Sequence, residues 1–200
     1  MRTTKPFSTI SFNSEAFLVG KLTELVKAKR LSFFAVIKHK PEDDEGGKKE
    51  HFHVYCEPSK MMQTDDMKDE LTEYDPEKPD KPKTCIPCNS SNFDNWALYG
   101  LHDKRYLAMK NQSRRFHYRY EDFITSDADA LLFKFRSIDL TALSPYADME
   151  DAIMQGLTFE DFFSRGTIPI PQLRNFQFAW QCLVETMTNR NGREGHYNGE

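Results

Sequence analysis

Apolar and polar residues follow two different periods along the first part of the chain. Residues 6–12 read PFSTISF and have the two-residue period of a β-strand. Along residues 15–28, directly after residues that can cap a helix, the apolar positions recur at helical spacing. Residues 31–38 and 51–58 read LSFFAVIK and HFHVYCEP, and both have the length and composition of strands. A strand, a helix and two strands joined as a hairpin form the first half of a β-α-β-β-α-β unit.

The middle of the chain predicts two helices, after which the pattern changes. A polar helix is expected at residues 60–72, and residues 92–101, NFDNWALYGL, have the composition of a buried helix. Beyond Thr125 the apolar positions follow the helical period and predict three or four short amphipathic helices. The sequence therefore predicts an α+β fold, with an antiparallel sheet of the ferredoxin or RRM type, helices on one or both of its faces, and a small all-α C-terminal domain. We place the two domains at residues 1–128 and 129–200.

Composition narrows the class of protein. The chain has 200 residues with 16 Phe, enough for a hydrophobic core, and its formal net charge of −4 excludes a protein that is basic overall. No apolar run is long enough to span a bilayer, and the first residues alternate like a strand, unlike a secretory leader. We therefore expect a cytoplasmic protein with reduced cysteines and no membrane partner. Cys85 and Cys88 form a single Cys-x-x-Cys pair, which lacks the second pair of a zinc site.

Three histidines lie at the ends of the two predicted hairpin strands. His51 and His53 are two residues apart, so on a strand their side chains share one face, with Cβ atoms about 7 Å apart. His39 directly follows the neighbouring strand, and a hairpin that returns from His39 to His51 brings the imidazoles to one end of the sheet. This arrangement favours a divalent metal site; the alternative is a strand whose polar face carries histidines without a metal.

An acidic run supplies the fourth predicted metal ligand. Glu42 stands three residues after His39, and Asp43 and Asp44 follow it directly. Three nitrogens and one carboxylate oxygen suit manganese, cobalt or zinc better than magnesium, which prefers oxygen ligands. We expect Mn²⁺ as the ion, with Mg²⁺ as the alternative, and either aspartate as the alternative to Glu42. The competing interpretation is a solvated acidic turn.

A strand that ends in His, a carboxylate three residues on and a His-apolar-His strand together resemble the HUH endonucleases. The resemblance is closest to the replication initiators of bacterial rolling-circle plasmids, in which a later Tyr-Leu-x-His-Lys-like segment bears the catalytic tyrosine. Here that segment reads ALYGLHDKRYLAMK, with Tyr99, His102 and Lys104 in matching places and Gly100–Leu101 in place of Leu-x. YRYEDF at residues 118–123 is similar to a Tyr-x-x-Glu-Asp-Ile stretch of those proteins. The resemblance covers roughly residues 5–125 well and the helical C-terminal region more loosely.

This resemblance implies a role for each residue that it matches. The three histidines and Glu42 are then the metal ligands, although the family commonly has aspartate where this chain has Glu42. Tyr99 is then the nucleophile, which forms a 5′-phosphotyrosyl bond and leaves a free 3′-OH. Lys104 or a metal-bound water would help to remove the phenol proton. Tyr106, which also precedes a leucine in the basic segment, is the alternative nucleophile.

Residues 104–119 form the most basic segment of the chain and interleave cations with aromatic residues. Cations neutralise phosphates and aromatic faces stack on unpaired bases, so the segment predicts contact with DNA. The alternative is a solvated helix face with aromatic residues in the core. The predicted DNA contacts are Lys104, Arg105, Lys110, Arg114, Arg115 and Arg119, together with Lys38 and Lys40 near the metal site.

The predicted function is that of a plasmid rolling-circle replication initiator, which nicks and rejoins DNA through one tyrosine. Its implied partners are the origin DNA, single-stranded or in a hairpin at the nick site, and a host helicase and polymerase. An HUH relaxase or transposase for DNA mobilisation, and a non-cleaving DNA-binding regulator, are the alternatives. The helical C-terminal domain resembles the one through which such initiators form homo-oligomers; a lid on the catalytic domain is its alternative.

Overall fold

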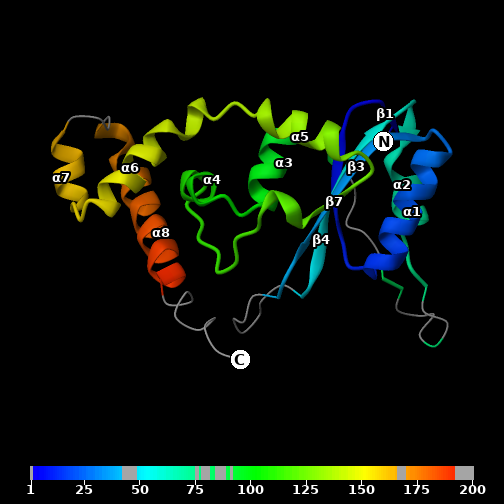
Figure 1. The fold of residues 1–200 in the computed structure, drawn as a ribbon, viewed down its shortest axis with the longest axis horizontal. Helices are drawn as coiled ribbons and strands as arrows, with labels where there is room; N and C mark the ends of the chain where they lie inside the picture. Colours follow the sequence, from blue (N-terminus) through cyan, green and yellow to red (C-terminus); the bar gives the residue numbers. More distant parts are fainter. Residues whose placement is uncertain are drawn as a thin grey trace. The chain divides into compact units, whose positions relative to one another are not determined.

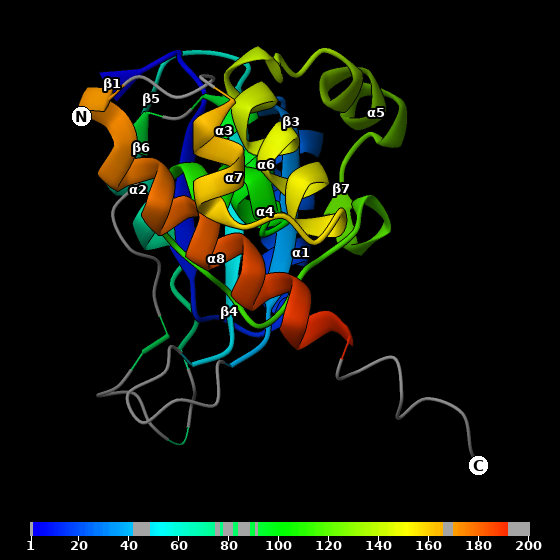
Figure 2. The same ribbon diagram turned by 90° about the vertical axis from the view of Figure 1, so that its left-hand side faces the viewer.

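The structure is a computed structural model, and its chain divides into two compact units. The first comprises residues 1–100 and 119–138, and the second comprises residues 101–118 and 139–200. The predicted domain boundary at residue 128 falls inside the first unit. Figure 1 and Figure 2 show the helices and strands of both units. The structure describes residues 2–41, 49–74, 77, 82–83, 89–90, 92–165 and 170–191.

An antiparallel sheet forms the centre of the first unit. Its strands lie in the order β6-β2-β4-β3-β7, so that β4 pairs with β2 on one side and with β3 on the other. Together with the helices on its faces, this sheet confirms the predicted α+β class. A separate two-stranded sheet pairs β1 with β5. The strands are β1 (Arg2–Thr3), β2 (Phe7–Ser11), β3 (Leu31–His39), β4 (His51–Pro58), β5 (Met62–Gln63), β6 (Asn89–Ser90) and β7 (Phe123–Thr125).

Two helices, α1 (Glu15–Lys27) and α2 (Thr64–Glu70), cover one face of this sheet (Figure 1). Helix α1 presents leucines at helical spacing to the sheet, and the strands contribute every second residue. Helix α2 is shorter than the helix predicted at residues 60–72, because the chain just before it pairs with β1. The core on this side includes Phe7, Leu18, Leu22, Leu25, Phe34, Val36, Phe52, Val54, Cys56, Met67 and Leu71.

Helix α3 (Phe93–Gly100) lies on the opposite face of the sheet, with α5 (Ala128–Arg136) contributing an aromatic ring. The ring of Tyr55, on β4, lies with its centroid 5.3 Å from that of Phe93 and 5.2 Å from that of Trp96. Phe123 and Phe135 extend this aromatic layer. Both faces of β4 are therefore covered, which explains why its first six residues are buried. The short helix η1 (Tyr120–Asp122) precedes β7.

In the second unit, every element that the structure describes is a helix. Helices α4, α6, α7 and α8 share one core, which includes Met149, Phe162, Trp180 and Leu183. Thr158 begins α7 with a capping box in which its side chain and that of Asp161 each accept a backbone N–H. Throughout the described residues, each helix is too short or too polar to cross a membrane. The helices are α4 (Lys104–Met109), η2 (Thr141–Leu143), α6 (Ser144–Met154), α7 (Phe159–Ser164), η3 (Ile170–Gln172) and α8 (Leu173–Asn191).

Candidate metal centre

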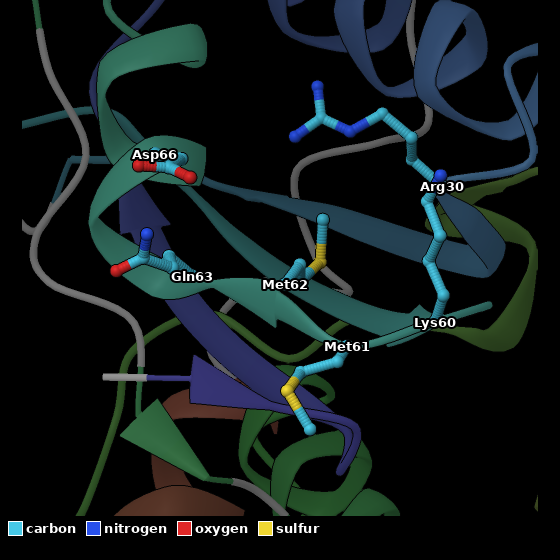
Figure 3. Close-up of a pocket in the computed structure, with 6 residues that line it drawn as sticks. All are labelled: Arg30, Lys60, Met61, Met62, Gln63 and Asp66. Carbon is cyan, nitrogen blue, oxygen red and sulfur yellow. The ribbon is translucent and has the colours of Figure 1, made fainter.

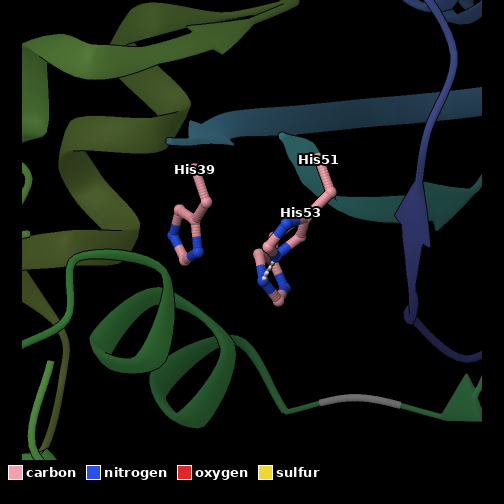
Figure 4. A group of neighbouring side chains, drawn as sticks. All are labelled: His39, His51 and His53. Carbon is pink, nitrogen blue, oxygen red and sulfur yellow. Dashed lines mark hydrogen bonds between the residues drawn. The ribbon is translucent and has the colours of Figure 1, made fainter. Parts of the chain in front are cut away.

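Three histidines from β3 and β4 meet on the face of the sheet that α3 covers (Figure 4). His39 is the cross-strand partner of His51, and His53 lies two residues further along β4, so all three side chains project from one face. Their residues are only 2%, 4% and 7% exposed. One nitrogen from each ring lies within 4.8 Å of the other two. The three predicted nitrogen ligands are therefore close enough together to bind one metal ion.

Hydrogen bonds to backbone carbonyls indicate which nitrogen of two rings faces the site. Nδ1 of His51 lies 2.8 Å from the carbonyl oxygen of Lys49, and Nε2 of His39 lies 2.7 Å from that of Gly100. Because a carbonyl oxygen only accepts, each of these nitrogens carries the hydrogen when the ring is neutral. The ligand nitrogens are then Nε2 of His51 and Nδ1 of His39. Such outer hydrogen bonds fix the tautomer and orientation of metal-binding histidines.

The distance between a ring nitrogen of His51 and one of His53 tests whether an ion fits between these two rings. Nε2 of His51 and Nε2 of His53 are 3.1 Å apart, the contact drawn as a dashed line in Figure 4. Two lone pairs at this distance repel unless a proton or a cation lies between them. With metal–nitrogen bonds of about 2.1 Å, this separation corresponds to an angle of about 95° at the ion. That angle lies between the octahedral and tetrahedral values, so the donor atoms of His51 and His53 are spaced as two ligands of one divalent transition metal.

The predicted carboxylate ligand lies outside the described residues. Glu42 and its alternatives Asp43 and Asp44 all fall in the segment that the structure does not describe. The same is true of the Cys85 and Cys88 pair. The structure therefore brings together three of the four predicted ligands. The choice among Glu42, Asp43 and Asp44 stays a prediction.

Tyr99 lies beside the histidines. It projects from α3 and is half-buried, and its ring centroid is 5.4 Å from that of His53 in an edge-to-face contact. The alternative nucleophile, Tyr106, belongs to α4 in the second unit and is buried there. The ammonium group of Lys110 lies 5.4 Å from its ring centroid. Within the first unit, the predicted nucleophile therefore adjoins the predicted metal ligands.

No protein-family model matches the chain, and no curated protein matches its sequence. What the site can do therefore follows from its donors. A divalent ion held by three imidazoles keeps positions open for an oxygen of a substrate or for water. Such an ion withdraws charge from a phosphate and orients it for attack. Together with a neighbouring phenol, the arrangement suits phosphoryl transfer to tyrosine.

Two of the predicted DNA-binding cations are engaged inside the second unit. Lys104 forms an ion pair with Glu150, and Nε of Arg105 lies 2.8 Å from the other carboxylate oxygen. Burial raises the pKa of Glu150, but hydrogen bonds and charge from the two cations outweigh it and hold that pKa below its usual value. The pair of cations thus attaches α4 to α6. The role of Glu150 as partner of these cations was not predicted, because the amphipathic pattern of α6 does not distinguish Glu150 from the other polar residues of the helix.

The remaining residues that were predicted to contact DNA differ in their interactions and in their exposure. Lys38 pairs with Glu50 at 2.9 Å, and both side chains are exposed, so this ion pair contributes little to stability. The guanidinium group of Arg114 donates to the carbonyl of Ser113 at 3.2 Å. Four further residues of the predicted set are exposed, namely Lys40, Lys110, Arg115 and Arg119.

A second polar group, on the same face of the sheet as the histidines, was not predicted from the sequence. The hydroxyl of Tyr55 donates to Oε1 of Glu57 at 3.2 Å, and Nζ of Lys134 lies 2.5 Å from the same oxygen. The Lys134 ammonium also lies over the rings of Phe33 and Phe93, at 5.2 and 5.7 Å from their centroids. Burial, followed by the charge of Glu57, raises the pKa of Tyr55 strongly. The available signal was the two-residue period of β4, which continues from the histidines through Tyr55 to Glu57.

A pocket of about 360 Å³ lies at the other end of the β3–β4 pair from the histidines (Figure 3). Arg30 immediately precedes β3 and Lys60 follows β4, and these strands run antiparallel. Arg30 forms an ion pair with Glu70 at 2.5 Å. Met61, Met62, Gln63 and Asp66 complete the lining. Its mixed charges and its place distinguish this pocket from the metal centre.

Proposed function

We propose that the chain is an HUH-type DNA endonuclease and strand transferase that initiates rolling-circle replication of a plasmid. The observation that carries the proposal is the position of Tyr99, whose ring contacts His53 within the cluster of His39, His51 and His53. A phenol next to a cation site supplies the two components of tyrosine-mediated phosphoryl transfer. Mn²⁺ is the proposed ion, and Glu42 the proposed fourth ligand.

The strand order supports a ferredoxin-like β-α-β-β-α-β arrangement in the proposed catalytic domain. Taking β2, β3, β4 and β6 as its four strands in chain order, their order across the sheet is 4-1-3-2. Helix α1 joins the first two of these strands, and α2 lies between the last two. Strand β7 then adds a fifth strand beside β3. This is the arrangement that places a central His-x-His strand beside a strand ending in His.

In the proposed reaction, Tyr99 attacks a DNA phosphorus atom. The phenol oxygen forms a bond to phosphorus, the phosphorus–O3′ bond breaks, and the product is a 5′-phosphotyrosyl bond with a free 3′-OH. When bound, the cation withdraws charge from the scissile phosphate and stabilises the charge that builds up in the transition state. Lys104 is paired with Glu150, which favours a water molecule in the site as acceptor of the phenol proton. The departing 3′ oxygen takes up a proton.

The helices of the second unit support a C-terminal region for assembly into a homo-oligomer. Origin DNA, single-stranded or in a hairpin, is the proposed substrate, and a host helicase and polymerase are the proposed partners for the replication that follows. The proposed contacts to the phosphates of this DNA are the exposed cations of the basic segment, above all Arg115 and Arg119.

The experiment that tests this proposal is an assay for a covalent adduct. The protein is incubated with Mn²⁺ and 5′- and 3′-labelled single-stranded oligonucleotides that tile the DNA flanking its gene. We expect a denaturation-resistant adduct on the 5′ end of the cleaved strand, which is lost on chelation of the metal and in Tyr99→Phe. Tyr106→Phe serves as the matched control and should retain the adduct.

Each other outcome identifies an alternative. An adduct in Tyr99→Phe that is absent in Tyr106→Phe would assign the nucleophile to Tyr106. A tight complex without cleavage would favour a DNA-binding regulator. Cleavage only at a site of DNA transfer or excision, and not at a replication origin, would favour a relaxase or transposase.

A further inference from the structure

A hydrogen bond joins a proposed metal ligand to the residue that follows the proposed nucleophile. Nε2 of His39 donates to the carbonyl oxygen of Gly100 across 2.7 Å, and both residues are buried. Gly100 is the last residue of α3, where helix carbonyls lack partners within the helix. His39 therefore satisfies a helix-end carbonyl, and in return that carbonyl holds the hydrogen of the imidazole on Nε2.

Gly100 also lies unusually close to the strand that carries His39. A Cβ atom at this position would stand 3.1 Å from Cγ2 of Ile37 and 3.6 Å from Cζ of Phe123. Ile37 precedes His39 by two residues on the same face of β3. The absence of a side chain thus lets the end of α3 rest directly on the strand, at the distance that the hydrogen bond needs.

From these two contacts we infer that Gly100 is a positioning residue for the metal centre. Its carbonyl selects the tautomer of His39 that presents Nδ1 to the ion, whereas His51 presents Nε2. Because Gly100 directly follows Tyr99, the same contact ties the helix of the nucleophile to the ligand set. The inference about the metal rests on the histidine cluster, and only the link to Tyr99 rests on the proposed function.

The first test uses the metal-free wild-type protein, labelled with ¹⁵N on histidine. We expect the His39 ring to show a protonated Nε2 and an unprotonated Nδ1 at neutral pH, and the His51 ring to show the reverse. His39→Gln and His51→Gln assign the signals. A neutral His39 with its hydrogen on Nδ1 would overturn the inference without any reference to activity.

The second test measures Mn²⁺ affinity by titration calorimetry on Gly100→Ala. The added methyl group should push the helix end away from Ile37 and weaken the hydrogen bond to His39. Loss of an outer hydrogen bond to a metal-binding histidine typically lowers metal affinity about 10- to 100-fold, and we expect a loss in this range. Ile37→Leu removes the methyl group on Cβ while keeping the side-chain volume, and by itself should change the affinity less than about two-fold.

The double variant Gly100→Ala/Ile37→Leu separates positioning from general damage. Because the leucine makes room for the alanine methyl group, the double variant should regain most of the lost affinity and the wild-type His39 tautomer. Wild-type affinity in Gly100→Ala, or no recovery in a folded double variant, would overturn the inference. If the wild-type protein itself binds no Mn²⁺, both the inference and the proposed function fail. If the wild-type protein binds Mn²⁺ and Gly100→Ala binds it equally well, the inference alone fails.

Discussion

The rings of His53 and Tyr99 meet edge to face, with their centroids 5.4 Å apart and an interplanar angle of 67°. The phenol ring thus packs against one proposed ligand, while the three imidazoles present their nitrogens to one another. Ring packing and metal ligation are separate properties of this site. Replacing the tyrosine hydroxyl and replacing the imidazole should therefore have different consequences.

Tyr99→Phe should bind Mn²⁺ with an affinity within about two-fold of wild type, whereas His53→Ala should lose measurable binding. An ion at 100 times its dissociation constant stabilises a folded protein by about 2.7 kcal/mol, so thermal unfolding with and without Mn²⁺ measures both variants. His117→Ala, in the second unit, is the control and should keep the full shift. Loss of the shift in Tyr99→Phe would make the phenol oxygen a metal ligand.

Glu150→Gln should destabilise the second unit. The substitution leaves Lys104 and Arg105 without their carboxylate, and hydrogen bonds to charged groups contribute about 1.5–3 kcal/mol each before solvent exposure of the cations reduces this value. We expect a loss of about 1–3 kcal/mol in urea unfolding. Asp151→Asn, at the exposed neighbouring acid, is the matched control and should change stability by less than about 0.5 kcal/mol.

The same carboxylate gives a pH dependence whose sign is fixed. The pKa of Glu150 lies below its usual value in the folded protein, so the unfolded chain takes up the proton first as the pH falls. The stabilisation is complete above a pH of about 4.3, the ordinary pKa of glutamate, and is lost as the pH falls through the lowered pKa. Glu150→Gln should therefore show a flatter decline of unfolding free energy below that pH. If the unfolding free energy of Glu150→Gln falls below that pH as steeply as that of the wild type, Glu150 is not the source of the dependence.

The elements that the sequence predicted well are those in which one pattern runs over many residues. Strands β3 and β4 each span eight or more residues of strand-like composition, and α1 repeats its apolar positions at helical spacing over 13 residues. The histidine cluster was predictable because a two-residue spacing defines a shared face of a strand and a hairpin aligns the strand ends. The two-residue strands β1, β5 and β6 carry no detectable period, since pairing with distant residues is what makes them strands.

Contacts between distant segments account for what the sequence did not predict. The pairing of Lys104 with Glu150 depends on how two helices pack, and the residues are 46 positions apart. From the sequence, Lys104 is one cation in a basic run, and nothing local distinguishes a DNA contact from an internal ion pair. The contact between His39 and Gly100 joins residues 61 positions apart and requires the end of α3 to rest on β3.

Tyr55 should make the folded protein sensitive to alkali. Its pKa is raised by burial and by Glu57, so above a pH of about 10 the unfolded chain loses the phenol proton while the folded protein retains it. The free energy of unfolding should therefore fall as the pH rises beyond 10. Tyr55→Phe should reduce that fall, which urea unfolding between pH 9 and about 11.5 measures.

Tyr74→Phe provides the comparison for the alkaline limb. Tyr74 is 67% exposed, so this substitution removes a tyrosine hydroxyl at the surface instead of a buried one. This variant should follow the wild-type curve. If both variants change the alkaline limb equally, or neither does, the buried hydroxyl of Tyr55 is not the source of the dependence.

Arg115 and Lys104 should respond differently to loss of charge in DNA binding. Arg115 is exposed, so Arg115→Gln should weaken binding to single-stranded DNA and lower the slope of log affinity against log salt by about 0.7, the value for one phosphate contact. Lys104 is engaged by Glu150, so Lys104→Gln should lower the stability of the protein and leave that slope unchanged at temperatures where the variant is folded. Fluorescence anisotropy over a range of salt concentrations measures both slopes. A reduced slope in Lys104→Gln without a change in stability would show that this lysine binds phosphate and that its pairing with Glu150 gives way to DNA.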